Sequence, residues 1–466
     1  MRLSSLKNVH FVGIGGIGMS GIADVLITMG FHVAGSDLRR SPTTAALEQR
    51  GARISIGHDA QNVKGADVVV YSSAVSSDNP EVVEARKMGV PVIPRAEMLA
   101  ELMRIKSSVA VAGSHGKTTV TAMVAHCAHR AGLDPTVVIG GRLSTLGASS
   151  RLGKGDLLVA EADESDRSFL LLYPTLAVIT NIDWDHVDAY PALEDLQEAF
   201  LSFANKVPFY GAVVACFDDP NLQALFPGFR RRLITYGLSP SADYRALPLQ
   251  SDSGERFRVW SRGEELGEIW VPQVGRHVIL NSLAALAVGD EMGIDFEELR
   301  DSLAAFPGAD RRFQLKGEAR GIRVVDDYGH HPTEVKATLE AARKIVGDGR
   351  LVVLFQPHRY SRLQALMEDF ATSFHEADVL VVTDVYAANE SPIEGVTGEA
   401  LAEKTRLLGH RGVHSCPKLE DLPGYVVPLL REGDLVITLG AGNITQAGPK
   451  LLAALADSAG DKGEKP

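Results

Sequence analysis

The sequence predicts an α/β protein built from three domains. Its 466 residues are enough for two to four domains of roughly 100–200 residues each. Short apolar strands alternate with amphipathic helical stretches along almost the whole chain, which is typical of doubly wound parallel sheets. This strand-first pattern starts three times, so we expect domains at residues 1–105, 106–309 and 310–466.

Composition excludes several classes of protein. The chain is 45% hydrophobic and 23% charged, as expected of a globular domain rather than a disordered or fibrous one. Its net charge is −12 and it has no Lys/Arg block, so we expect no nucleic-acid partner. Its first residues do not read as a signal peptide, and no apolar run approaches the roughly 18 residues that cross a bilayer. Three scattered cysteines suggest neither disulfides nor a zinc site, so we expect a cytoplasmic protein that inserts into no membrane.

The first unit carries a glycine-rich turn. Gly13, Gly15 and Gly18 form G-x-G-x-x-G directly after the strand HFVGIG and before the helical stretch SGIADVLITMG. Asp37 ends the next strand, HVAGSD. Such a turn lets backbone N–H groups and a helix N-terminus approach a diphosphate, so we expect a Rossmann-like domain that binds a nucleotide. NAD and a UDP-sugar both fit this pattern.

The second unit carries a phosphate loop at residues 112–119, between the strand VAVA and a helix. The Walker A pattern is incomplete, because Val111 occupies the position of its first glycine. The functional half, Gly116-Lys117-Thr118, is intact. Lys117 can reach the terminal phosphates of a nucleoside triphosphate, and the Thr118 hydroxyl can bind Mg²⁺. We therefore expect a P-loop ATPase-like central domain.

Acidic residues follow two strands of this central unit. The strand DLLVAEADESD ends in Glu161, Asp163 and Glu164, and AVITNIDWDHVDAY ends in Asn181, Asp183, Asp185 and His186. We expect these two strands to be neighbours, because α/β sheets bind ligands at the carboxyl ends of their strands. Carboxylates with one imidazole suit Mg²⁺ or Mn²⁺ better than Zn²⁺. One or two of these residues should be ligands, and the others solvated loop residues.

Eight motifs in order resemble the Mur ligase family over nearly the whole chain. They are HFVGIGGIGMSGIA, AGSHGKTTVTAM, AEADESDRSFL, TNIDWDHVDAY, GRHVILNSLAA, DDYGHHPTEV, FQPHRYSR and GAGNI. The resemblance implies an ATP-dependent, ADP-forming amide ligase of peptidoglycan precursor synthesis. It implies that a carboxylate of UDP-N-acetylmuramate is phosphorylated, and that the amine of L-alanine attacks the resulting acyl phosphate.

The resemblance also implies roles for individual residues. As catalytic residues it implies Lys117, Arg312 and His330. For ATP it implies Gly113, Ser114, His115, Gly116, Lys117, Thr118, Thr119, His277, Asn281, Arg312 and Asp327. For His277, an equally good interpretation is an ordinary surface histidine without a role in binding. For the substrates it implies Gly15, Gly16, Asp37, His58, Ser73, Tyr328, Arg359 and Arg362. For Mg²⁺, or Mn²⁺, it implies Thr118, Glu161 and His186, with Glu164 as a rival to Glu161.

The stretch DDYGHHPTEV, residues 326–335, opens the third unit, which we expect to be a second Rossmann-like domain. Its two histidines are adjacent and cannot share one helix face, which argues against a metal site. Pro332 suits the first turn of a helix, so the sequence predicts a helix that begins there and covers PTEVKATLEAARKIV. We expect a substrate-positioning turn that acts when the third domain closes, with Asp326 and His331 in structural roles.

Other functions remain open at this stage. An NAD-dependent oxidoreductase would explain the glycine-rich turn but not GSHGKTT or the acidic strand ends. A recycling member of the same family would attach a preformed tripeptide to the same sugar nucleotide, although the motif wording favours the L-alanine-adding member. The sequence does not choose among alanine, glycine and serine. It also does not place a carbamoylated lysine, since Lys206 is only nearby in sequence. We expect a monomer or a weak homodimer.

Overall fold

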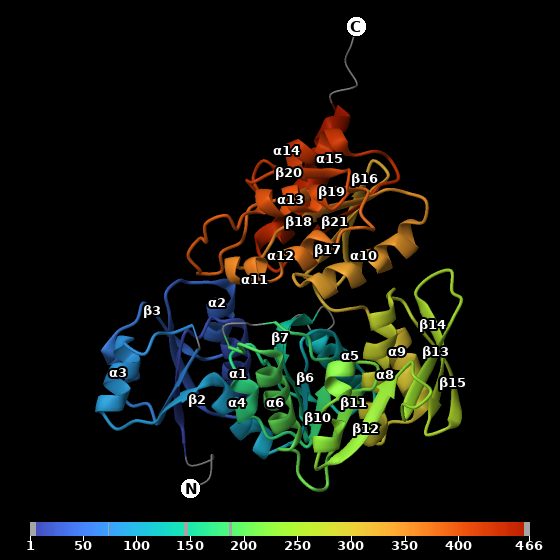
Figure 1. Ribbon diagram of the computed structural model, residues 1–466. Coiled ribbons are helices and arrows are strands. Elements are labelled where there is room, and N and C mark those ends of the chain that lie inside the picture. Colours follow the sequence, from blue (N-terminus) through green and yellow to red (C-terminus); the bar gives the residue numbers. More distant parts are fainter. Residues whose placement is uncertain (1–5, 73, 144–147, 186–188, 461–466) are drawn as a thin grey trace.

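Three β-sheets organise the molecule, one in each of three domains (Figure 1). The computed structural model describes residues 6–72, 74–143, 148–185 and 189–460. Among them, no helix is long and apolar enough to cross a membrane. The C-terminal domain lies above the N-terminal and central domains, which lie side by side in Figure 1. The predicted three-domain α/β fold is confirmed.

The N-terminal domain is a parallel sheet in the order β3-β2-β1-β4-β5. Its strands are β1 (Asn8–Val12), β2 (His32–Asp37), β3 (Arg53–Ile56), β4 (Val68–Tyr71) and β5 (Val92–Pro94). Its helices are α1 (Ile17–Thr28), α2 (Pro42–Gln49), η2 (Ala60–Val63), α3 (Pro80–Lys87) and α4 (Arg95–Arg104). The chain order reverses at β1, between β2 and β4, and the glycine-rich turn follows β1. Such a reversal opens a crevice beyond the strand ends, where α/β sheets bind ligands.

The central domain is a ten-stranded mixed sheet, β15-β14-β13-β12-β11-β10-β6-β9-β7-β8. Its first strands are β6 (Ser107–Ala112), β7 (Thr136–Leu143), β8 (Ala148–Arg151), β9 (Leu157–Glu161), β10 (Leu176–Ile179), β11 (Ala212–Cys216) and β12 (Arg232–Gly237). Its first helices are α5 (Lys117–Arg130), η3 (Ser168–Leu171), α6 (Leu193–Ala204), α7 (Pro220–Gln223) and η4 (Phe226–Gly228). The expectation that β9 and β10 are neighbours is wrong, because β6 pairs with both. The two acidic segments therefore flank the phosphate loop that follows β6.

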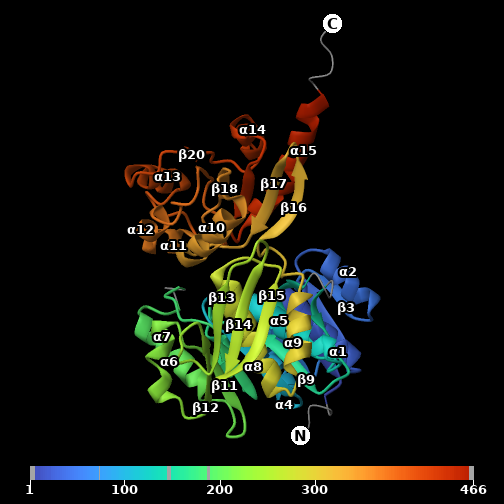
Figure 2. The same cartoon turned by 90° about the vertical axis from the view of Figure 1, so that its right-hand side faces the viewer.

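The sequence did not indicate the antiparallel end of this sheet. It contains β13 (Tyr244–Leu249), β14 (Glu255–Ser261) and β15 (Glu264–Val271), followed by α8 (Arg276–Glu291) and α9 (Phe296–Ala304). Figure 2 shows these strands beside α9, which packs on β15. The strands are only partly buried, so they lack the continuous apolar runs that mark β6, β9 and β11.

The C-terminal domain is a six-stranded sheet in the order β16-β17-β21-β18-β19-β20. Its strands are β16 (Gln314–Ala319), β17 (Ile322–Asp327), β18 (Leu351–Phe355), β19 (Val379–Val382), β20 (Val413–Ser415) and β21 (Leu435–Leu439). Its helices are α10 (Pro332–Val346), α11 (Tyr360–Ala365), α12 (Met367–Ala371), α13 (Gly398–Leu407), α14 (Leu422–Val426), η5 (Val427–Leu429), η6 (Asn443–Gln446) and α15 (Ala447–Gly460).

Helix α10 confirms the prediction that a helix starts at Pro332. His331 is its N-cap, and the His331 ring accepts a hydrogen bond from the Thr333 N–H. Val335, Leu339 and Ala342 form its buried face. Since that face packs in the core of the C-terminal domain, Leu339→Ala should cost about 2–5 kcal/mol of stability.

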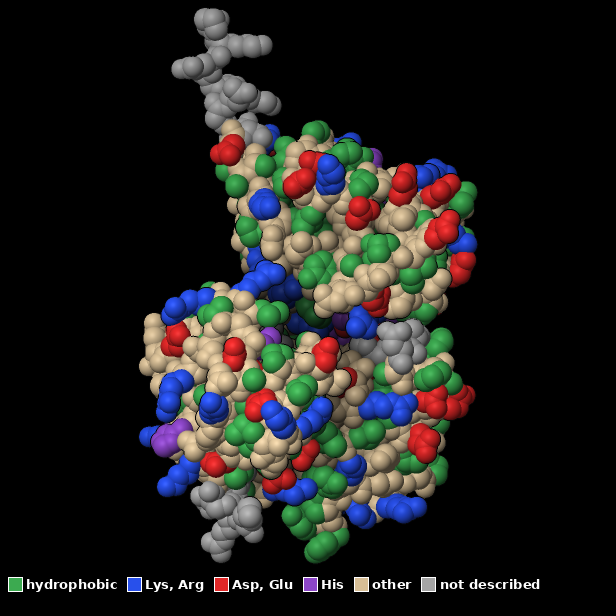
Figure 3. Space-filling view, turned by 90° about the vertical axis from the view of Figure 1, so that its left-hand side faces the viewer, with side chains coloured by type: hydrophobic (Ala, Val, Ile, Leu, Met, Phe, Trp, Pro, Cys, Tyr) green, Lys and Arg blue, Asp and Glu red, His purple; other side chains and the backbone are tan. Residues whose placement is uncertain are grey.

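The hydrophobic cores divide the molecule in two. One continuous core runs from Val9 in the N-terminal domain to Ala309 at the end of the central domain. The C-terminal domain has separate cores around Val353 and Val352, on the two faces of its sheet. Figure 3 shows a hollow between this domain and the body below it, with Lys, Arg and His side chains along it. The N-terminal and central domains are thus joined by apolar packing, and the C-terminal domain has cores of its own.

Candidate active site

The phosphate loop has the shape that its glycines allow. Gly113 has φ +132°, and a Cβ there would lie 2.0 Å from the Thr180 Oγ1, so only glycine fits. Gly116 has φ +82° and is the N-cap of α5. The Ser114 N–H donates to the backbone oxygen of Asn181 at 3.1 Å, and its hydroxyl donates to the Asp183 carbonyl at 2.9 Å. The segment after β10 therefore holds the loop open toward the N-terminus of α5, where a phosphate would be stabilised.

Lys117 lies inside this loop. Its ammonium donates to the Gly113 carbonyl at 2.7 Å and pairs with Glu164 at 2.8 Å. Burial alone would lower the pKa of Lys117, but the charges of Glu164, Asp163 and Glu161 outweigh it and raise that pKa. Burial raises the pKa of Glu164 to about 7 in spite of the lysine beside it. The loop thus holds a permanent cation whose carboxylate partner a phosphate can replace.

Thr118 and Glu161 form an oxygen pair next to Lys117. The Thr118 hydroxyl lies 3.1 Å from each carboxylate oxygen of Glu161. Hydroxyl and carboxylate oxygens suit Mg²⁺, so the donor set fits the predicted metal. Glu164 faces Lys117 instead, which favours Glu161 over its rival. The third predicted ligand, His186, lies outside the described residues.

A cavity of about 340 Å³ opens between the central and C-terminal domains. The predicted ATP residues on its wall are His115, Gly116, Thr119, His277, Asn281, Arg312 and Asp327. The remaining predicted ATP residues, Gly113, Ser114, Lys117 and Thr118, belong to the phosphate loop beside it. Apolar and amide wall residues that the sequence did not single out are Tyr236, Gln273 and Phe306. The cavity therefore has an apolar wall and a cationic end, as an adenine nucleotide requires.

Three predicted ATP residues differ in how they are held. His277 is exposed on the cavity wall, and the crowding of its neighbours together with the Arg312 charge lowers its pKa. Arg312 pairs with Glu334 at 3.5 Å. Asp327 accepts hydrogen bonds from the Phe313 and Gly329 N–H groups, each at 2.8 Å. Asp327 thus shapes the turn after β17 in addition to lining the cavity.

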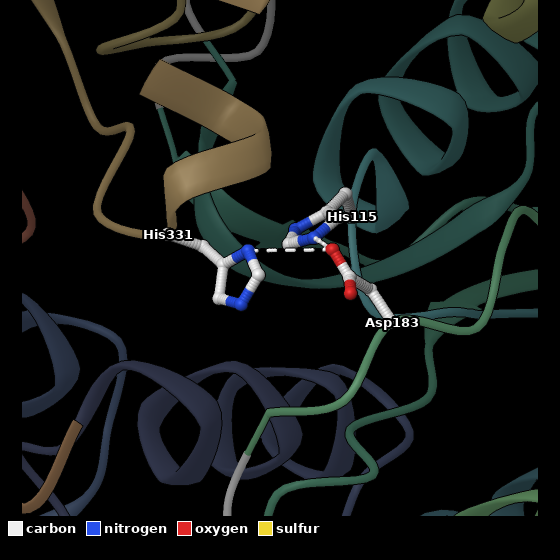
Figure 4. Close-up of side chains that lie close together, drawn as sticks. All are labelled: His115, Asp183 and His331. Atoms are coloured by element: carbon white, nitrogen blue, oxygen red, sulfur yellow. Dashed lines mark hydrogen bonds and ion pairs between the residues drawn. The ribbon is translucent and has the colours of Figure 1, made fainter. Parts of the chain in front are cut away.

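His115, Asp183 and His331 meet where the phosphate loop touches α10 (Figure 4). The His115 Nε2 lies 2.9 Å from the Asp183 carboxylate, and its Nδ1 lies 3.4 Å from Glu334. The Thr333 hydroxyl donates to Asp183 at 2.6 Å. Burial opposes protonation of His115, but its two carboxylate partners raise its pKa to about 9. His115 is therefore an imidazolium that ties the loop to the C-terminal domain.

The turn after β17 gathers aromatic rings. Tyr328 and His330 lie with ring centroids 5.3 Å apart, and the Arg312 guanidinium lies 5.2 Å from the Tyr328 ring. The His330 N–H donates to Glu334 at 3.0 Å. Burial lowers the pKa of His330 to about 3, so its imidazole is neutral. His330 thus lies beside Glu334, which in turn contacts His115 of the central domain.

Arg362, which was predicted to bind substrate, contacts Asp185 instead. Its guanidinium makes a two-pronged contact with the Asp185 carboxylate, each N–O distance being 3.0 Å, and both side chains are buried. Arg359 lies near Glu390 at 3.6 Å and has φ +70°, a strained value for a non-glycine residue. In this arrangement Arg362 joins two domains.

In the N-terminal domain, Asp37 holds the glycine-rich turn. Its carboxylate accepts the Gly15 N–H at 2.9 Å, and a Cβ at residue 15 would lie 2.8 Å from the same oxygen. Gly16 follows as the N-cap of α1. His58 lies beside Ser36 at the end of β2. Ser73 lies outside the described residues.

A second cavity, of about 240 Å³, joins this turn to Glu161, one of the predicted metal ligands. Gly16 and Gly18 line one side, and Glu161 and Asp163 line the other. Arg95, at the start of α4, also lines it, and its guanidinium packs against Gly18. The sequence reasoning missed Arg95, because it follows an ordinary strand, PVIPR, and belongs to no motif.

Three family models match the chain in order. They are the Mur ligase family catalytic domain over residues 8–107, the Mur ligase middle domain over residues 111–289 and the Mur ligase glutamate ligase domain over residues 311–442. The chain belongs to the Mur ligase family. Membership explains both the phosphate loop and the glycine-rich turn. The oxidoreductase alternative explained only the glycine-rich turn.

Individual Mur ligases are similar over almost their full length. A UDP-N-acetylmuramate–L-alanine ligase of Myxococcus xanthus is 58% identical over 448 residues, which cover 96% of this chain and 95% of that protein. A UDP-N-acetylmuramate–L-alanine ligase of Geobacter sp. (strain M21) is 55% identical, and the match covers 97% of this chain and 98% of that protein.

Solved Mur ligase structures agree with the fold. The UDP-N-acetylmuramate–alanine ligase MurC of Thermotoga maritima has a TM-score of 0.81 at 30% identity, covering 97% of this chain and all of that one. A murein peptide ligase of Psychrobacter arcticus has a lower TM-score of 0.69 at 26% identity, with 97% and 99% coverage.

Proposed function

We propose that this Mur ligase joins L-alanine to the lactyl carboxylate of UDP-N-acetylmuramate, using ATP and releasing ADP and phosphate. One observation carries the proposal. Glu161 lines the cavity that begins at the glycine-rich turn, and it also contacts Thr118 of the phosphate loop. A sugar nucleotide bound at the turn would extend toward the terminal phosphate of ATP. The similar proteins named as L-alanine ligases support this choice of amino acid.

The chemistry requires positioning and charge stabilisation more than covalent help. A carboxylate is a poor acyl donor, and phosphorylation by ATP converts it into an acyl phosphate with a good leaving group. Lys117 in the phosphate loop and Arg312 on the cavity wall stabilise the charge on the transferred phosphoryl group. The amine of L-alanine then attacks the acyl carbon, and a tetrahedral intermediate collapses to the amide and phosphate. Tyr328 and His330 face the reacting carboxylate and the amine.

Mg²⁺, or Mn²⁺ in its place, fits the oxygen pair of Thr118 and Glu161, with His186 as the predicted third ligand. When bound, the ion neutralises phosphate charge and orients the terminal phosphoryl group. Lys117 keeps its own position by its contacts with Gly113 and Glu164.

We also propose a division of labour among the domains. Residues 1–105 bind the sugar nucleotide through Gly15, Gly16, Asp37, His58 and Ser73, and Arg95 attracts an anionic group of that substrate. Residues 106–309 bind ATP. Residues 310–466 bind the amino acid, with Arg359 at its edge, and Arg362 fixes the closed domain arrangement. The protein works in the cytoplasm as a monomer or weak homodimer.

The decisive test is phosphate release from ATP in the presence of UDP-N-acetylmuramate and a panel of amino acids. We expect release to depend on L-alanine, with glycine and serine weaker. Stimulation by a tripeptide and not by L-alanine would favour the recycling ligase. If neither stimulates release, and NADH absorbance changes with a small substrate instead, the ligase proposal is wrong.

A further inference from the structure

A buried carboxylate in the N-terminal domain gathers hydrogen bonds beneath the ligand edge of the sheet. Glu81, in the first turn of α3, is fully buried. Its Oε2 accepts from the Ser36 hydroxyl at 2.6 Å and lies 3.0 Å from the His10 Nε2. Its Oε1 accepts from the Asn62 amide at 2.6 Å and from the Asp59 N–H at 3.2 Å. All four groups can donate, so only an acceptor such as a carboxylate satisfies them together.

This carboxylate stays ionised without a lysine or arginine beside it. Burial alone would raise the pKa of Glu81, but the hydrogen bonds from His10, Ser36 and Asn62 outweigh burial and lower it. A buried charge is costly to keep, and here four donors hold it in one place. Glu81 therefore fixes the orientation of the side chains that donate to it.

The network reaches the ligand edge of the sheet mainly through Ser36, and a longer contact of 3.8 Å joins the Glu81 Oε1 directly to the His58 Nδ1. Ser36 is buried near the end of β2, and its Oγ lies 2.9 Å from the His58 Nδ1. The Ser36 hydrogen is used by Glu81, so the Ser36 oxygen must accept, and the His58 Nδ1 must carry the proton. His58 keeps 15% of its side chain exposed, and its Nε2 makes no hydrogen bond to any residue that the structure describes. In the neutral ring, the Nε2 of His58 then carries the lone pair.

His58 lies close to the glycine-rich turn, where the sugar nucleotide is proposed to bind. The Gly57 N–H donates to the Asp37 carbonyl, and the N–H groups of Gly13 and Ile14 donate to the Ser36 carbonyl. The loop that carries His58 is therefore attached to the same strand end as the glycine-rich turn. We propose that Glu81 and Ser36 are positioning residues that fix His58 as a hydrogen-bond acceptor for an N–H or O–H group of the sugar nucleotide. This inference rests on the proposed function of that turn.

Ser36→Ala tests this relay with little change in volume. We expect KM for UDP-N-acetylmuramate to rise about three- to tenfold, the effect of one lost hydrogen bond, while kcat and KM for ATP stay within twofold. In a His58→Ala background, Ser36→Ala should have no further effect, because its only route to the substrate is gone.

Two controls separate this role from a structural one. Asn62→Ala removes a hydrogen bond of the same length from the other oxygen of Glu81, and we expect it to change KM less than twofold. Nitrogen NMR of histidine-labelled protein, assigned with His58→Ala, should show the proton on Nδ1 in the wild type and in Asn62→Ala. Ser36→Ala should weaken that preference, because only the 3.8 Å contact with Glu81 then remains at Nδ1.

The outcomes distinguish this inference from the proposed function. If the wild type shows L-alanine-dependent phosphate release but Ser36→Ala leaves KM and the His58 tautomer unchanged, the inference is overturned and the function stands. A KM effect that persists in the His58→Ala background also overturns it. If the wild type releases no phosphate with L-alanine, the proposed function fails, and the NMR result still decides whether the relay exists.

Discussion

At the scale of single residues, the site is a set of charges held in place before any ligand arrives. Lys117 already points into the phosphate loop, and Thr118 already faces Glu161. Preorganised charges of this kind need no rearrangement when negative charge develops on a phosphoryl group. Glu164, which holds Lys117 in place, is therefore as important to the site as the residues that touch substrate.

Lys117→Ala should abolish most turnover while sugar-nucleotide binding survives. Removal of one preorganised charge-stabilising group costs on the order of 10²–10³ in kcat. The glycine-rich turn belongs to another domain, so Kd for UDP-N-acetylmuramate should stay within twofold by calorimetry. Lys336→Ala, on the exposed side of α10, is the control and should behave as wild type. Unchanged turnover in Lys117→Ala would remove this lysine from the mechanism.

Glu161→Gln and Glu164→Gln should separate the metal ligand from the partner of the lysine. Loss of a carboxylate ligand should raise the Mg²⁺ concentration for half-maximal activity at least tenfold, and excess Mg²⁺ should restore part of the rate. Glu164→Gln should leave that concentration nearly unchanged, because Glu164 faces Lys117. The opposite pattern, measured by Mg²⁺ titration of phosphate release, would assign the ligand to Glu164.

At the scale of elements, the sequence predicted what is local and missed what depends on pairing. The start of α10 followed from Pro332, and the phosphate loop followed from its position between a strand and a helix. The placement of β6 between β9 and β10 could not be predicted, because strand order depends on crossovers that leave no local pattern. The contact of Arg362 with Asp185 also left no local pattern, because these residues are brought together only by the packing of two domains.

The link between the phosphate loop and α10 should make stability depend on pH. The pKa of His115 is raised to about 9 in the folded protein, against about 6.5 when unfolded. Its contribution, on the order of 2–3 kcal/mol, is thus fully present below pH 6.5 and lost as pH rises through 9. The pKa of Asp183 is lowered, despite burial, by His115 and its other partners, so its contribution is lost only at acidic pH.

We therefore expect the thermal midpoint of the nucleotide-free protein to fall by roughly 2–3 °C more in the wild type than in His115→Gln between pH 6.5 and 9.5. Scanning calorimetry at several pH values measures the difference. His375→Gln, an exposed histidine of the C-terminal domain, controls for the substitution and should keep the wild-type slope. Parallel curves for the wild type and His115→Gln would show that His115 is not charged in the folded protein.

At the scale of the whole molecule, two kinds of interface have different consequences. The N-terminal and central domains share one apolar core, so they should move together. The C-terminal domain meets the central domain through polar contacts, among them the pairs of Arg362 with Asp185 and of Lys344 with Glu255. Polar contacts can be exchanged for water, which suits a domain that must open to admit ATP and release ADP.

The buried pair of Arg362 and Asp185 should hold the C-terminal domain in place. Removal of one partner of a buried ion pair costs about 3–5 kcal/mol, because the other charge is left uncompensated. Arg362→Gln should therefore raise the radius of gyration in small-angle scattering and lower kcat at least tenfold. Asp185→Asn alone should do the same, whereas the double variant should be closer to the wild type, because neither charge is then stranded.

Lys344→Ala is the matched control for this prediction. Lys344 also joins the two domains, to Glu255 at 3.2 Å, but 60% of its side chain is exposed. The lysine is largely in water, and Glu255, although buried, also accepts the Gly275 N–H, so this variant should keep the wild-type radius and lose less than about fivefold in rate. If Arg362→Gln keeps the wild-type radius and raises only KM for L-alanine or the sugar nucleotide, Arg362 binds substrate, as its motif first suggested. If it raises the radius and lowers kcat while Lys344→Ala does neither, closure depends on one buried contact.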